Sequence, residues 1–159
     1  MAVELLVRLK SIEDYIKRQH GGPRPIAPRE LDQLAHWSDR MLEYIKSRWP
    51  VDTGTSRDRW TYELDPSFGR IGIRIENPMY YAEWVHHRGG SPETPLWETL
   101  VPEAFQLIKE PMLVAVRNQV DLTERAISRR RASGVADRRA LLDILSDPEL
   151  SDIFGGIFG

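Results

Sequence analysis

The chain contains no cysteine among its 159 residues. This absence excludes disulfide bridges, thiol catalysis and cysteine zinc sites, and it fits a cytosolic origin. No apolar run approaches the roughly 20 residues that a membrane-spanning helix requires. The first residues lack a basic leader and carry Glu4 inside their apolar run, which argues against a signal peptide. We therefore expect a soluble intracellular protein that does not use a membrane.

An excess of either charge is also missing. The 22 basic and 24 acidic residues nearly cancel, so the composition does not indicate a general affinity for nucleic acid. The signatures of serine hydrolases, phosphate-binding loops and dinucleotide-binding folds do not occur in the sequence. His86 and His87 would point to opposite faces of a strand, and His20 and His36 belong to distant segments. We expect no enzyme activity, no catalytic residue, no cofactor and no metal.

The hydrophobic pattern predicts an α+β fold, in which a small antiparallel β-sheet packs against two or three α-helices and a helical C-terminal extension follows. One domain is expected over residues 1–122, and a basic helical extension with an apolar tail over residues 123–159. The expected elements, in chain order, are a helix at 3–19, a linker at 21–28, a helix at 28–49, a hairpin of strands at 59–64 and 70–75, and a helix at 101–120. Pro111 should kink or divide the last of these helices, because proline removes a backbone donor and clashes with the preceding turn.

The clearest turn signal is Pro50-Val51-Asp52-Thr53-Gly54, which follows the second expected helix directly. Asp52 and Thr53 can bond nearby backbone groups and Gly54 can adopt positive φ, so the segment suits a tight helix-to-strand corner. A catalytic Asp-Thr-Gly is the competing interpretation. It requires a second carboxylate that shares a proton with the first, and the charged strand that follows is unlike the apolar setting of such a loop. We favour the corner.

A second charged feature lies near the end of the chain. Arg129, Arg130 and Arg131 form a run that Arg138 and Arg139 extend. These side chains could contact DNA phosphates. They could equally lie on a solvated helix face or pair with acids of a neighbouring subunit. The aromatic interleaving that is typical of single-strand binders is missing.

The order of the motifs resembles one protein family. An amphipathic helix precedes Pro50-Val51-Asp52-Thr53-Gly54, a hairpin leads to Asn77, and Tyr81-Ala82 and a glycine-rich loop come before the last helix. This set spans roughly residues 31–120 and resembles the tail-completion, or head–tail joining, proteins in the neck of long-tailed bacteriophages. The resemblance assigns structural roles to Pro50, Asp52, Thr53, Gly54, Asn77, Tyr81 and Ala82.

The resemblance implies a structural virion protein that works by surface complementarity. Its copies would form a ring, hexameric in our interpretation, around the DNA channel at the head–tail interface. Its partners would be itself, portal, adaptor or stopper proteins above, tail-tube or terminator proteins below, and the DNA passing through the channel. It would be located in the virion, and in the host cytoplasm during assembly. We expect the interface residues to be His87, Arg88, Gly89, Gly90, Ile153, Phe154, Ile157 and Phe158.

Three alternatives stay open. A tail terminator or a head-closure (stopper) protein forms a similar ring in the same particle. A DNA-binding protein using the arginine-rich region belongs to a different class. An aspartate-dependent hydrolase that uses Asp52 is the third.

Overall fold

The computed structural model describes residues 3–50, 55–65, 70–79, 82, 85 and 95–132. Three strands and four helices lie in these ranges, in the order β1 (Val3–Arg8), α1 (Lys10–His20), α2 (Pro28–Arg48), α3 (Thr55–Asp58), β2 (Thr61–Asp65), β3 (Gly72–Asn77) and α4 (Leu96–Ala132). The strands form one antiparallel sheet in the order β1-β3-β2. The α+β prediction is therefore confirmed.

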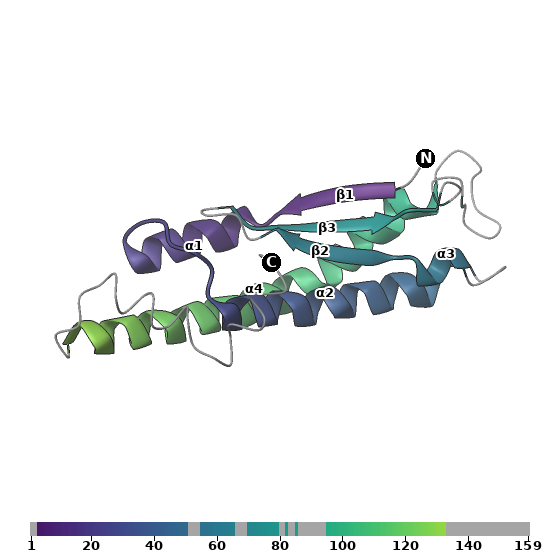
Figure 1. Ribbon diagram of the computed structural model, residues 1–159. Helices are drawn as coiled ribbons and strands as arrows, with labels where there is room; N and C mark the ends of the chain where they lie inside the picture. The colour runs from purple at the N-terminus through teal and green to yellow at the C-terminus, as the bar shows by residue number, and fades with distance from the viewer. Residues whose placement is uncertain are drawn as a thin grey trace.

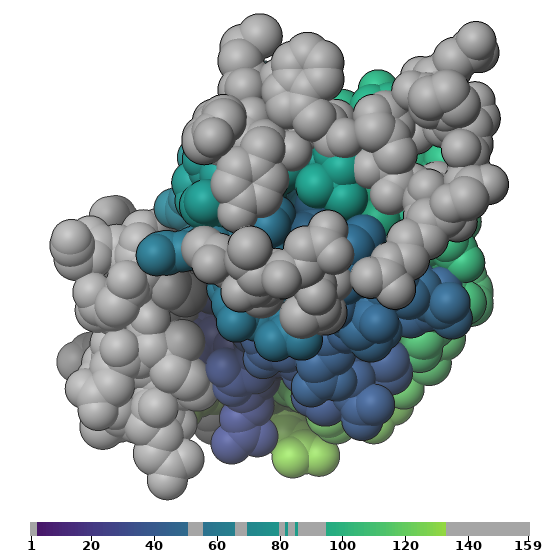
Figure 2. Space-filling model, turned by 90° about the vertical axis from the view of Figure 1, so that its right-hand side faces the viewer, coloured from purple at the N-terminus to yellow at the C-terminus, as the bar shows by residue number. Residues whose placement is uncertain are grey.

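The two long helices lie on one face of the sheet (Figure 1). α2 and α4 run side by side beneath it, and α2 in blue lies beside α4 in green in the end-on view of Figure 2. Side chains of α2, β3 and α4 are fully buried between the sheet and the two helices, among them Met41, Ile45, Ile73, Ile75 and Val116. Because this core removes most of the apolar surface from water, it is the main source of stability.

The strand register explains which face is buried. Leu5, Ile75 and Tyr62 align across the three strands. Strand side chains alternate between faces, and this row points towards the helices. The opposite face carries the row Leu6, Arg74 and Glu63. The Arg74 guanidinium lies 3.2 Å from a Glu4 carboxylate oxygen and 3.6 Å from one of Glu63. One face is therefore core, and the other is charged.

Several predicted elements are confirmed. The second helix begins at Pro28 and ends beside Trp49, as its periodicity and Pro50 indicated. Gly21 has φ of +81° and its N–H donates to Lys17 O, so it ends α1 in the left-handed conformation that glycine adopts easily. The linker and the β2–β3 antiparallel pair lie where they were expected. The turn at 66–69 is outside the described residues.

The expected helix over residues 3–19 is wrong in its first part. Val3–Arg8 is an edge strand, and the helix begins only at Lys10. The apolar residues here fit both periods, because Val3, Leu5 and Val7 alternate while Leu6 and Val7 also match a helical stripe. This segment forms a strand because it pairs with β3, which lies more than sixty residues later in the chain.

The expectation that Pro111 divides the last helix is also wrong. α4 is one helix of 37 residues with Pro102 and Pro111 inside it. Both prolines are exposed. Pro111 deprives the Leu107 carbonyl of its usual donor, and Leu107 itself is 56% exposed, so water can reach that turn. α4 also crosses residues 122–123, where the basic extension was expected to begin, without a break.

Candidate functional site

The first candidate region is the end of the molecule where α2 passes into α3. Trp49 and Trp60 are buried there with an edge-to-face geometry, 5.0 Å between ring centroids. The Trp49 Nε1–H donates to the Ser56 hydroxyl at 3.0 Å. Edge-to-face packing stabilises such a pair beyond its buried area. The aromatic pair therefore joins the end of α2 to the residues that follow the Pro-Val-Asp-Thr-Gly segment.

Asn77 completes this connection. It is fully buried at the end of β3, and its amide N–H₂ donates to Ser56 O at 2.8 Å. Its side-chain oxygen accepts the Met79 N–H at 3.1 Å. The Ala82 N–H then donates to Met79 O, and Ala82 is fully buried. Asn77 thus connects α3 with the chain that leaves β3.

Of the other residues that the resemblance names, Pro50 is described and half-buried. Asp52, Thr53, Gly54 and Tyr81 lie outside the described residues. The same holds for the expected interface residues His87, Arg88, Gly89, Gly90, Ile153, Phe154, Ile157 and Phe158, and for Arg138 and Arg139.

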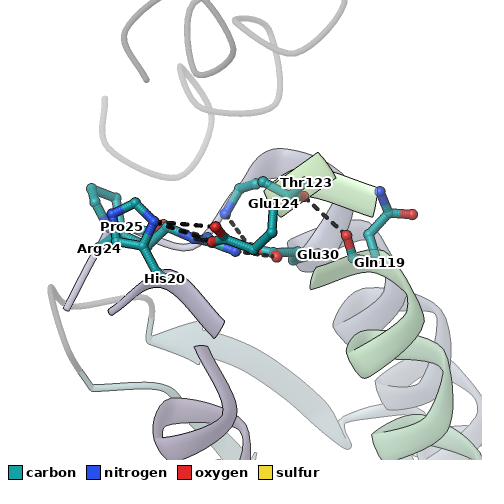
Figure 3. A network of polar contacts seen from close by, with 8 residues as sticks. His20, Arg24, Pro25, Glu30, Gln119, Thr123 and Glu124 are labelled. Atoms are coloured by element: carbon teal, nitrogen blue, oxygen red, sulfur yellow. Dashed lines mark hydrogen bonds and ion pairs between the residues drawn. The ribbon is translucent and has the colours of Figure 1, made fainter. Parts of the chain in front are cut away.

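The second candidate region is the opposite end of the molecule, where α1 lies beside the distal half of α4 (Figure 1). A polar network joins these helices to the start of α2 (Figure 3). Its centre is Arg24, whose side chain is 1% exposed. Two guanidinium nitrogens donate to Glu30 at 2.8 Å each, and Nε donates to Glu124 at 2.8 Å. Burial opposes the charge of Arg24, but the two carboxylates outweigh it and raise the pKa of the guanidinium.

Glu30 has two functions in the network. Besides binding Arg24, it accepts the backbone N–H of Ala27 at 2.7 Å. This bond caps the N-terminus of α2, although Ala27 has no side-chain oxygen to complete a capping box. His20 approaches Glu124 at 3.2 Å. The linker, α2 and α4 are therefore held together by buried charges.

Next to the network, a groove of about 670 Å³ opens between α1 and α4. It is lined by Tyr15, Gln19, Asp121, Glu124, Arg125, Ser128 and Arg129. The Tyr15 hydroxyl donates to Asp121 at 2.7 Å, and this hydrogen bond raises the pKa of the tyrosine. Asp121 and Glu124 are thus occupied by partners within the chain.

The cations of the groove differ in this respect. Arg125 and Arg129 are exposed. Neither has an ion pair or side-chain hydrogen bond with another residue in the part of the chain that the structure describes. On α1, the Arg18 guanidinium lies 5.7 Å from the centroid of the Tyr15 ring, and Tyr15 lines the groove. The groove can therefore bind an anionic group through charge-assisted hydrogen bonds.

Comparison with models of protein families, with curated proteins and with solved structures found no match. The two regions are therefore characterised by their geometry. Within the described ranges, no three or more histidine, aspartate or glutamate side chains are placed to hold a metal ion together, and no described helix has the length and apolarity to cross a membrane.

The sequence carries a signal for some residues of the second candidate region and none for others. Arg129, Arg130 and Arg131 form an adjacent run in the last turn of α4, and Arg129 lines the groove. The network of Arg24 and Glu124 was missed, because residues a hundred positions apart give no local signal. Glu30 had a signal, since it lies three residues after the residue that precedes α2.

Proposed function

We propose that the chain is a structural subunit of the neck of a long-tailed bacteriophage, which joins or completes the tail at the head–tail interface. The ordered motifs of the sequence carry this proposal. The structural observation that supports it best concerns Asn77, one of the residues of the resemblance, because its buried side chain joins α3 to the chain that leaves β3.

The two ends of the molecule also suit a joining protein. α3 and the end of β3 lie at one end and the groove with Arg125 and Arg129 at the other, with the 37-residue α4 running between them. At about 1.5 Å per residue this helix is roughly 55 Å long. A neck subunit must contact one partner above and another below, and neighbouring copies through a heterologous interface that closes into a ring.

The test is electron microscopy of particles from a phage in which this gene is deleted. We expect filled heads beside separate tails of normal length. Tails of uncontrolled length would instead indicate a terminator, and heads that leak DNA would indicate a closure protein. Intact infectious particles would refute the neck assignment.

Deleting residues 153–159 gives a second test. This segment includes Ile153, Phe154, Ile157 and Phe158, and the proposal makes it an intersubunit contact. We expect the truncated chain to remain soluble and monomeric and to fail in assembly. The matched control replaces Ser151 by alanine and should assemble normally. Normal assembly of the truncated chain would contradict the role of this segment.

A DNA-binding function is the second candidate, because Arg125 and Arg129 have no partner among the described residues. Its signature is an affinity for duplex DNA that falls steeply with salt, with a slope that decreases when phosphate-contacting arginines are removed. No binding at low salt would exclude it.

A further inference from the structure

Among the described residues that line the groove between α1 and α4, the two exposed charges are both positive. Asp121 and Glu124 line it, but they accept Tyr15 and Arg24 respectively. Arg125 and Arg129 also line it, and neither has an ion-pair partner among the described residues. A ligand in this groove therefore meets two exposed cations.

One exposed apolar side chain lies near these cations. Leu122 is 54% exposed and lies about one helical turn before Arg125 on α4. A leucine beside exposed arginines fits a peptide that carries both acidic and apolar side chains. The phosphate backbone of DNA would make no apolar contact with this leucine.

The chain itself contains such a peptide. Residues 140–159 hold four acidic residues and no basic ones. They also hold nine large apolar residues: Leu141, Leu142, Ile144, Leu145, Leu150, Ile153, Phe154, Ile157 and Phe158. The charge and the apolar content of this segment complement both properties of the groove.

We infer that the groove receives residues 140–159 of a neighbouring copy. This inference rests on the proposed function, because a ring requires two different, complementary patches on every subunit, and the segment and the groove are such a pair. Residue 140 lies eight positions beyond Ala132. At about 3.5 Å per residue it reaches at most ~28 Å from the end of α4. Neighbouring copies must therefore lie with these ends close together.

The absence of cysteine makes the inference directly testable. Ser128 lines the groove and Ser151 lies in the acidic segment, so each can become a single cysteine with little change in shape. Two differently tagged full-length chains, S128C and S151C, are mixed and treated with a short thiol–thiol crosslinker. We expect a product that carries both tags. As a control, Ser47, exposed on α2, is replaced by cysteine and should give no product with S151C.

A double variant separates docking between chains from docking within one chain. The S128C/S151C chain is diluted into an excess of the cysteine-free protein before crosslinking. A crosslink confined to single chains, with no product from the mixed variants, would overturn the inference. The absence of any crosslink would overturn it as well.

Charge reversal tests the recognition itself. Replacing Arg125 and Arg129 by glutamate should lower the yield of the two-tag product about tenfold or more, since like charges then face each other. Reversing Arg29 and Arg40, two exposed arginines of α2, should leave the yield unchanged. Reversing Asp147 and Glu149 in the donor chain should restore the product with the R125E/R129E acceptor.

The outcomes also distinguish this inference from the neck assignment. Gene deletion with particle microscopy tests the neck role and does not depend on the groove. If purified protein binds a duplex oligonucleotide through Arg125 and Arg129 and gives no two-tag product, DNA is the occupant and the inference is wrong.

Discussion

Replacing Arg24 by methionine should destabilise the protein more than any surface change. The arginine donates four hydrogen bonds: two to Glu30, one to Glu124 and one to the Pro25 carbonyl at 3.0 Å. Methionine fills a similar volume but donates nothing. The Glu30 side chain, 0% exposed, would then keep only the Ala27 N–H as a partner.

The expected cost follows from that burial. Removing one partner of a buried ion pair leaves an uncompensated charge and costs about 3–5 kcal/mol. A domain of this size is stable by about 5–15 kcal/mol, so the change would remove a large fraction of its stability. At about 2–4 °C per kcal/mol, the midpoint of thermal unfolding should fall by roughly 6–20 °C.

The assay is denaturant unfolding followed by circular dichroism, with Arg29→Met as the control. Arg29 is exposed on the same helix, and its loss should change stability by no more than about 0.5 kcal/mol. The double variant Arg24→Met/Glu30→Met removes both charges and should be less destabilised than the sum of the single variants. If R24M costs no more than R29M, the network contributes nothing to stability and our account of it is wrong.

Three further predictions follow from single side chains. The Glu13 carboxylate accepts a hydrogen bond from the Arg8 guanidinium at 2.8 Å, and this bond lowers the pKa of Glu13 below its ordinary 4.5. The stabilisation by Glu13 is therefore complete above pH 4.5 and is lost as the pH falls through the lowered pKa. E13Q should make the free energy of unfolding less dependent on pH in the acid range, and an unchanged dependence would contradict this. Burial and the neighbouring Asp39 carboxylate raise the pKa of Tyr62 to about 12. The difference between the ultraviolet titrations of the wild type and Tyr62→Phe should therefore show one tyrosine ionising near pH 12, and a difference near pH 10 would refute this. Asn77→Ala leaves two backbone groups without partners and should cost about 1–3 kcal/mol by denaturant unfolding, whereas Asn118→Ala on α4 should cost little.

The sequence predicted the elements whose signals are local. α2 has a long apolar stripe between Pro28 and Pro50. Ile71, just before β3, and Ile73 and Ile75 within it alternate with Gly72, Arg74 and Glu76. β1 could not be predicted in this way. Its identity depends on pairing with β3, and tertiary pairing overrides a short ambiguous pattern.

The same distinction between local and long-range signals holds for the candidate sites. The arginine run could be recognised because its residues are adjacent in the sequence, and Asn77 because it belongs to an ordered set of motifs. The groove could not be predicted, because α1 and α4 contribute its residues from separate parts of the chain. Which charged groups have a hydrogen-bond partner depends on long-range contacts such as Tyr15–Asp121, and the periodicity of the sequence does not predict those contacts.

The strand order β1-β3-β2 has a consequence for synthesis of the chain. β1 is translated first, yet its partner begins only at Gly72. At roughly 5–20 residues per second, β1 waits about 3–13 s for that partner. During this time its backbone donors and acceptors are unpaired, which invites pairing with other nascent chains. Glu4 and Arg8 place charges on the strand, and neutralising both should raise aggregation during expression more than it lowers the stability of the folded protein.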